Sequence, residues 1–340
     1  MGDNKDYLPY IDISKLLCAI LVVFIHFRSQ LYGSSIGSMI VACFSNQAVP
    51  FFMIVSGFFW SRKINNATNK SDIIRITIKV CFNYLMIYIV WSILWLPSLL
   101  NTYKYIYPNS SILYFIFVLI RRFFIGGQGV YWYLLVLSES LFVASVLIRY
   151  NKDKLLYIIG AIGLVLGLIY ELNINSFGLH YINQITYLIF GWNNNVFMKG
   201  LPYIAIGYYC HKNYGKAIIK QKAGIITYVL SSLIMISMYY LNNYAGSLVL
   251  YPLQAISLFV IACKPATKNI SIKFSKLCRN LSSSIYYLHT VFKYGLASIL
   301  FNYISSGYIQ IFVAIMLSIG VYCIVKRFNI RPLMWLLSVK

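Results

Sequence analysis

The stretch IDISKLLCAILVVFIHFRSQL, residues 11–31, decides the class of fold. It is long and apolar enough to cross the ~30 Å hydrocarbon core of a bilayer as a helix. The whole chain shares this character, since 60% of its 340 residues are hydrophobic and only 11% are charged, against about 25% in soluble proteins. Its mean hydropathy is +0.72. This composition excludes a soluble, disordered or disulfide-stapled protein and predicts a polytopic helical membrane protein.

Apolar stretches of similar length recur along the chain, so we expect an all-α transmembrane bundle of about ten spans, forming a single domain over residues 1–340. The segment 99–130 breaks the pattern, because its apolar part from Ile112 to Ile125 is short for a span. We expect it to form an interfacial or re-entrant helix. The expected spans are residues 11–31, 40–60, 75–98, 131–149, 154–171, 196–211, 224–241, 247–263, 281–301 and 309–326.

The charges are strongly unbalanced, with 29 Lys and Arg against 7 Asp and Glu, a net charge of +22. The basic residues fall in short clusters between apolar stretches, as in cytoplasmic loops, and not in one patch typical of a nucleic-acid-binding protein. Their distribution predicts that both termini are cytoplasmic, and we expect a multi-pass protein of the bacterial plasma membrane. The seven cysteines form no CxxC motif, so neither a metal site nor a disulfide framework is expected.

Polar residues in the first span are the first candidates for function. Lys15 and His26 are eleven residues apart, which places them within ~20° of one helix face, with His26 about 16 Å further along the span. A snorkelling lysine and a structural histidine would explain the same pattern. Asp12 is expected to pair with Lys15 or with another cation at the membrane rim.

Two further polar groups lie deep in expected spans. His289 shares a helix face with Ser282 and Tyr286, and Glu139 is the one acidic residue near the middle of a span. A carboxylate at that depth needs a basic partner, water or a ligand, so it is either a structural ion pair or part of a site. Two histidines and a glutamate in one site could supply acid–base catalysis, or a proton relay in a transporter.

Six sequence motifs, taken in the order in which they occur, resemble those of the acyltransferase-3 family of integral-membrane acyltransferases. Together they cover nearly the whole chain. The IDxxK opening and the WYL motif followed by a glutamate are most similar to the fucose acetylase-like branch. One position departs from the family pattern, because Lys15 stands where the family usually has arginine, whose planar fork lysine lacks. The motifs are IDISK at 11–15 with His26 after ten further residues, VPFFMIVSGFF at 49–59, the basic residues Lys70, Arg75 and Lys79, YWYL at 131–134, FMKGLPYIAIG at 197–207 and LSSSIYYLH at 281–289.

The resemblance implies O-acyl transfer, usually of acetyl from cytoplasmic acetyl-CoA as co-substrate, to a hydroxyl of a glycan or lipid-linked sugar of the cell envelope. Catalytic roles are expected for four residues and donor binding for four more. A proton-coupled transporter or flippase of an envelope precursor remains an alternative, as does a non-catalytic membrane assembly or sensor protein. The expected catalytic residues are His26, His289, Glu139 and Tyr286, and the expected donor-binding residues are Lys15, Arg75, Lys79 and Ser56.

Overall fold

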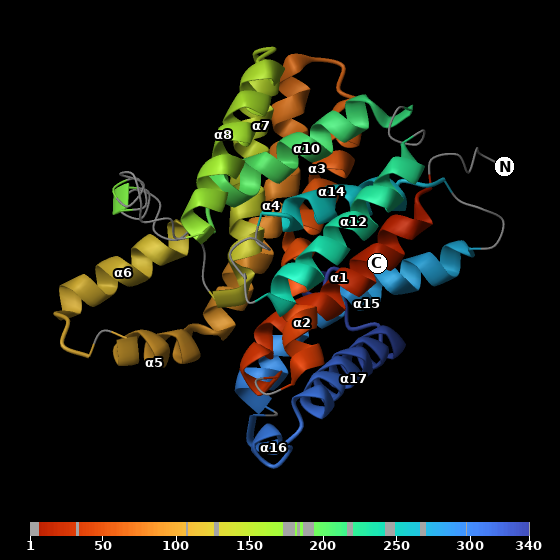
Figure 1. Cartoon of the computed structure of the whole chain (residues 1–340). Coiled ribbons are helices and arrows are strands. Elements are labelled where there is room, and N and C mark those ends of the chain that lie inside the picture. Colours follow the sequence, from red (N-terminus) through yellow and green to blue (C-terminus); the bar gives the residue numbers. More distant parts are fainter. Residues whose placement is uncertain are drawn as a thin grey trace. The chain divides into compact units, whose positions relative to one another are not determined.

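Every regular element that the structure describes is a helix (Figure 1). The structure is a computed structural model of the whole chain, and all statements below concern the residues that it describes. These are residues 7–31, 34–106, 108–125, 129–172, 181, 184–185, 194–215, 220–241, 249–265, 270–296 and 298–339.

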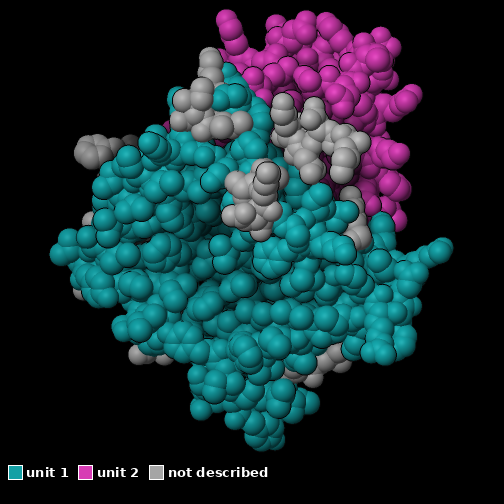
Figure 2. All heavy atoms as spheres, turned by 90° about the vertical axis from the view of Figure 1, so that its right-hand side faces the viewer, with its two compact units in different colours: residues 1–52, 213–340 teal, residues 53–212 magenta. Residues whose placement is uncertain are grey.

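The chain divides into two compact units, coloured separately in Figure 2. Unit 1 comprises residues 1–52 and 213–340, and unit 2 comprises residues 53–212. Helix α3 (Ala48–Ile64) begins in unit 1 and continues in unit 2. The other main helices of unit 1 are α1 (Pro9–His26), α2 (Ser35–Cys43), α12 (Gln221–Tyr240), α14 (Tyr251–Ala262), α15 (Ile272–Val291), α16 (Ser298–Asn302), α17 (Gly307–Arg327) and α18 (Arg331–Leu336). Those of unit 2 are α4 (Lys70–Leu94), α5 (Leu96–Ile106), α6 (Ile112–Phe124), α7 (Trp132–Arg149), α8 (Asp153–Leu172) and α10 (Leu201–Lys212).

The remaining elements are single turns. The short 3-10 helices are η2 (Arg28–Leu31), η3 (Ser45–Gln47) and η4 (Gly129–Tyr131), and the π-helical turns are η5 (Val196–Gly200) and η6 (Phe292–Leu296). A π-turn inserts an extra residue into the helical hydrogen-bond pattern and is often found at functional sites. Turn η6 directly follows α15.

Unit 1 is organised around α1 and α15, which pack against each other along their lengths. Helix α1 begins with Pro9, whose ring favours the first helical turn, and Asp12 places a negative charge where the helix dipole favours it. Helix α1 ends at His26 and is followed by η2, whereas the sequence predicted one span from 11 to 31. His26 is therefore the last residue of its helix, five residues before the expected end of the span.

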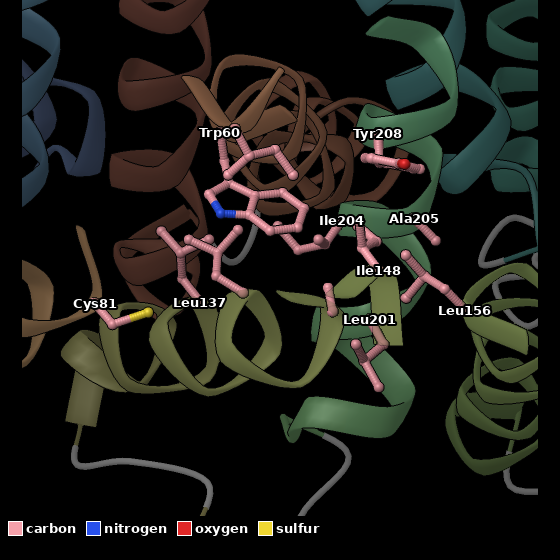
Figure 3. Close-up of a cluster of buried hydrophobic side chains, with 12 residues drawn as sticks. Trp60, Cys81, Leu137, Ile148, Leu156, Leu201, Ile204, Ala205 and Tyr208 are labelled. Atoms are coloured by element: carbon pink, nitrogen blue, oxygen red, sulfur yellow. The ribbon is translucent and has the colours of Figure 1, made fainter. Parts of the chain in front are cut away.

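Unit 2 has its core at Trp60, where α3, α4, α7, α8 and α10 contribute buried apolar side chains (Figure 3). The indole of Trp60 is 2% exposed and donates a hydrogen bond to Thr77 Oγ1 of α4 at 2.9 Å. An indole N–H needs such a partner inside an apolar core. This bond fixes the position of α4 against α3.

Two glycines let α3 and α10 approach closely within unit 2. A Cβ atom added at Gly57 would lie 2.7 Å from the backbone oxygen of Ile204, and one at Gly207 would collide with the backbone at Ile54. A backbone atom cannot move aside as a flexible side chain can. The glycines of the SGFF and GLPYIAIG motifs are thus explained by small-residue helix packing, which is common in membrane proteins.

Seven described helical segments are long and apolar enough to cross a membrane. The protein is thus a helical membrane protein, while the count of about ten spans and the cytoplasmic termini stay predictions. Two expected spans fall on shorter helices, 196–211 on η5 with α10 and 247–263 on α14, although residues 247 and 248 lie outside the described part of the chain. The expected span 281–301 begins within α15, which starts nine residues earlier.

Candidate active site

Helices α1 and α15 run in the same direction and in register. Ser275 hydrogen-bonds Asp12 near the start of the two helices, and the rings of His26 and His289 meet at their ends. Both contacts join residues that are 263 positions apart in the sequence. Within each helix the two contact points are separated by the same 14 residues, from 12 to 26 and from 275 to 289, or about 21 Å.

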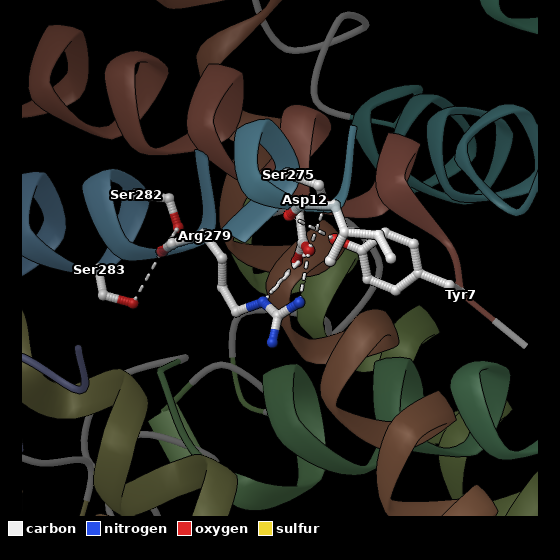
Figure 4. Close-up of polar contacts among 7 residues, drawn as sticks. Tyr7, Asp12, Ser275, Arg279, Ser282 and Ser283 are labelled. Atoms are coloured by element: carbon white, nitrogen blue, oxygen red, sulfur yellow. Dashed lines mark hydrogen bonds and ion pairs between the residues drawn. The ribbon is translucent and has the colours of Figure 1, made fainter. Parts of the chain in front are cut away.

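The contact at the helix starts is a charge-assisted cluster (Figure 4). The Asp12 carboxylate is buried and accepts hydrogen bonds from Arg279 Nε at 3.1 Å, Arg279 Nη2 at 2.8 Å and Ser275 Oγ at 2.8 Å. Because two N–H groups of one guanidinium bind the same carboxylate, they fix both the distance and the relative orientation of the Arg279 and Asp12 side chains. Arg279 is thus a partner of Asp12 that the sequence did not single out.

The contact at the helix ends is the histidine pair. The imidazole centroids of His26 and His289 are 5.1 Å apart, and the ring planes are tilted by 42°. His289 is fully buried, and His26 is half-buried. Halfway between the two contacts lie Ala19 and Ser282, both buried, whose small side chains allow the helices to stay close along the whole length.

The hydrogen bonding of His289 defines its tautomer. Its Nδ1 lies 2.8 Å from the carbonyl oxygen of Ile285, and because a carbonyl only accepts, Nδ1 must carry the proton. In the neutral ring Nε2 then has a lone pair. This Nε2 is buried and has no hydrogen-bond partner among the described residues. His289 therefore carries a buried proton acceptor in the ring that lies 5.1 Å from that of His26.

Tyr286 is the third predicted catalytic residue in this group. Its ring centroid lies 6.4 Å from that of His289 and 6.3 Å from that of Phe52, and the residue is 9% exposed. The structure thus brings His26, His289 and Tyr286 together. Lys15 lies on α1 as well, half-buried, eleven residues before His26.

The other predicted site residues belong to unit 2. Glu139 is partly buried on α7, and the hydroxyl groups of Ser56 and Tyr133 lie 3.2 Å apart between α3 and α7. Arg75 and Lys79 are exposed and one turn apart on α4. The grouping of these residues with the histidine pair stays a prediction.

Sequence reasoning missed Lys293, which lies four residues after His289 on η6. Its ammonium donates a hydrogen bond to the backbone oxygen of His26. A weak signal was present, because a lysine one turn after an intramembrane histidine is itself an ionisable group at depth. The described residues contain no cluster of His, Cys, Asp or Glu suited to hold a metal ion.

The fold is that of a helical membrane protein, and the histidine pair gives it two candidate acid–base groups in one place. The model of one family, described as an acyltransferase domain (Acyl_transf_3), matches residues 8–327. The chain therefore belongs to the acyltransferase-3 family and is a membrane acyltransferase. No curated protein and no solved structure gives a significant match to it.

Proposed function

We propose that the protein is an O-acetyltransferase of the fucose acetylase-like branch, which moves acetyl, or another short acyl group, from cytoplasmic acyl-CoA to a hydroxyl of a cell-envelope or exported glycan. The proposed setting is a bacterial plasma membrane, with about ten spans and both termini in the cytoplasm. The observation that carries the proposal is the 5.1 Å approach of His26 and His289 within an acyltransferase domain.

The donor carries several negative charges and cannot enter hydrocarbon, so we place its nucleotide at a basic cytoplasmic rim. Lys15, Arg75 and Lys79 are the proposed contacts, and Ser56 is a further hydrogen-bonding group for the donor. Ion pairs and hydrogen bonds from such groups would hold the phosphates while the pantetheine arm extends along α1. The thioester then reaches the imidazoles.

For the transfer step we assign the proton of the acceptor hydroxyl to an imidazole. An imidazole suits this role because its unperturbed pKa is near neutral pH. His26 acts as the general base, or takes the acetyl group transiently as a nucleophile. His289, with its Nε2 lone pair, orients the hydroxyl or the second imidazole as a hydrogen-bond acceptor, while Tyr286 and Glu139 are the remaining polar groups proposed for the site.

The test uses purified protein in nanodiscs with labelled acetyl-CoA and a panel of candidate glycans. His26→Ala and His289→Ala should each lower acceptor-dependent transfer by about 10²-fold or more, because the first removes the proposed general base and the second removes the group that orients the hydroxyl or the other imidazole. The matched control is His211→Gln, since His211 is a half-buried histidine of unit 2 whose Nδ1 bonds Ser61 Oγ at 2.8 Å. It should keep the transfer rate.

Two outcomes contradict the proposal. Turnover of the thioester that survives both alanine substitutions would remove the catalytic assignment. Movement of a glycan precursor across the membrane without CoA would instead favour the proton-coupled transporter or flippase. Labelled acetyl that stays on the protein when acceptor is omitted, and is lost in His26→Ala, would identify the nucleophilic route.

A further inference from the structure

Lys293 is placed beside the histidine pair by the π-helical turn η6. Its ammonium bonds the backbone oxygen of His26, and it lies 4.9 Å from the ring centroid of Phe27 and 4.8 Å from that of Tyr294. The residue is half-buried and close enough to interact electrostatically with both imidazoles.

No carboxylate pairs with this ammonium in the part of the chain that the structure describes. The two ion pairs found there join Lys199 to Glu171 and Arg279 to Asp12. Removing a cation from water without an anionic partner is costly, and an ionisable side chain kept at such a place in a membrane protein is a candidate for function. An ammonium has three N–H donors, and the His26 oxygen accepts one of them. Two donors remain for a substrate.

We propose that Lys293 is a catalytic residue that binds the oxyanion formed from the thioester carbonyl, an inference that rests on the proposed function. The acceptor hydroxyl oxygen bonds to the carbonyl carbon, its proton passes to an imidazole, and the carbonyl π electrons move onto oxygen. The ammonium stabilises that negative charge. When the carbonyl re-forms, the carbon–sulfur bond breaks, and the CoA sulfur keeps the electron pair and takes the proton from the imidazolium.

The tautomer of His289 explains why the oxyanion needs a donor other than this imidazole. A neutral His289 whose Nδ1–H is bound to Ile285 can only accept at Nε2, so it cannot donate a hydrogen bond to the thioester oxygen. Lys293 supplies the missing donor next to it and brings a full positive charge. Donors directed at a developing oxyanion contribute on the order of 10²–10³ in kcat.

The first measurement is steady-state acyl transfer by Lys293→Met and Lys293→Arg in nanodiscs. The methionine variant keeps the length of the side chain and loses the charge, so kcat should fall by about 10²–10³-fold while KM for acetyl-CoA changes little. The arginine variant should recover part of the loss because it restores charge and donors. The matched control is Lys326→Met, an exposed lysine that bonds the Tyr322 hydroxyl on α17, and it should keep wild-type kcat.

The second measurement separates catalysis from a structural role, because Lys293 also caps the last carbonyl of α1. We compare two unreactive CoA thioethers, one with a trifluoromethyl ketone, which mimics the tetrahedral oxyanion, and one with a methyl ketone, which mimics the ground state. Lys293→Met should bind the first about 10²-fold more weakly and the second as the wild type does. Equal losses for both compounds would mean a structural role and would overturn the proposal.

The failures of the two proposals can be told apart. If the wild-type protein transfers no acyl group from acyl-CoA, both the proposed function and the proposed role of Lys293 are wrong. If the wild type is active and His26→Ala is not, wild-type kcat in Lys293→Met would overturn only the role of Lys293.

Discussion

Asp12 is the residue on which the register of α1 and α15 depends most directly. The residue is 4% exposed, and its carboxylate accepts hydrogen bonds from three donor atoms of α15. Asp12→Asn keeps the shape of the side chain but leaves the guanidinium of Arg279 without its counter-charge. Removing one partner of a buried ion pair costs about 3–5 kcal/mol, and Arg279 is 36% exposed, so we expect about 1–3 kcal/mol.

The measurement for Asp12→Asn is the free energy of unfolding in mixed micelles. Lys273→Gln is the control, because Lys273 is an exposed cation on α15, the helix that carries Arg279. An Asp12→Asn protein as stable as the wild type would show that the cluster does not hold the two helices. A double-mutant cycle with Arg279→Gln would measure the pair itself.

At the scale of elements, the two equal 14-residue segments of α1 and α15 are the feature that creates the site. One alanine inserted between Leu16 and Leu17 of α1 would turn His26 by about 100° and move it about 1.5 Å relative to Asp12. We expect this variant to lose acyl transfer. A second alanine inserted between Arg279 and Asn280 keeps Ser275 and Arg279, the two partners of Asp12, in place and restores equal spacing of the two segments that end at His26 and His289, so the doubly inserted protein should regain part of the activity.

The control for this series is one alanine inserted between Asn109 and Ser110, in the turn that precedes α6. It should leave transfer unchanged. If each single insertion is active, or if the second insertion brings no recovery, the register of the two helices does not position the imidazoles. Acyl-transfer rates at equal amounts of folded protein are the readout.

Much of the fold could be predicted from the sequence because apolar length and charge distribution are local signals. The two histidines stood out for the same reason, since a polar group deep in an apolar stretch is conspicuous. The Asp12–Arg279 pair was not predictable, because it joins residues 267 positions apart and depends on the parallel packing of α1 and α15. The end of α1 at His26 and the π-turn that positions Lys293 are likewise set by packing, with no sequence pattern to mark them.

At the scale of the whole molecule, the distribution of Lys and Arg predicts that both chain ends are cytoplasmic. A fluorescent protein that folds only in the cytoplasm should therefore fluoresce when fused to either end, and protease added outside intact cells should not remove it. A fusion after Tyr303, in the turn before α17 that carries no basic residue, should stay dark. Fluorescence from only one terminus would require an odd number of spans.

In the proposed binding mode, the spacing of Lys15 and His26 along α1 also sets a minimum length for a donor that enters from the cytoplasmic side. The rim lysine at position 15 and the imidazole at position 26 are separated by about 16 Å of rigid helix. We therefore expect the protein to select donors by length as well as by acyl group. Acetyl phosphate and the acetyl thioester of a truncated thiol carry an activated acetyl group as well, but they are too short to contact Lys15 and the imidazoles at the same time. Each should therefore be a poor acyl donor compared with acetyl-CoA.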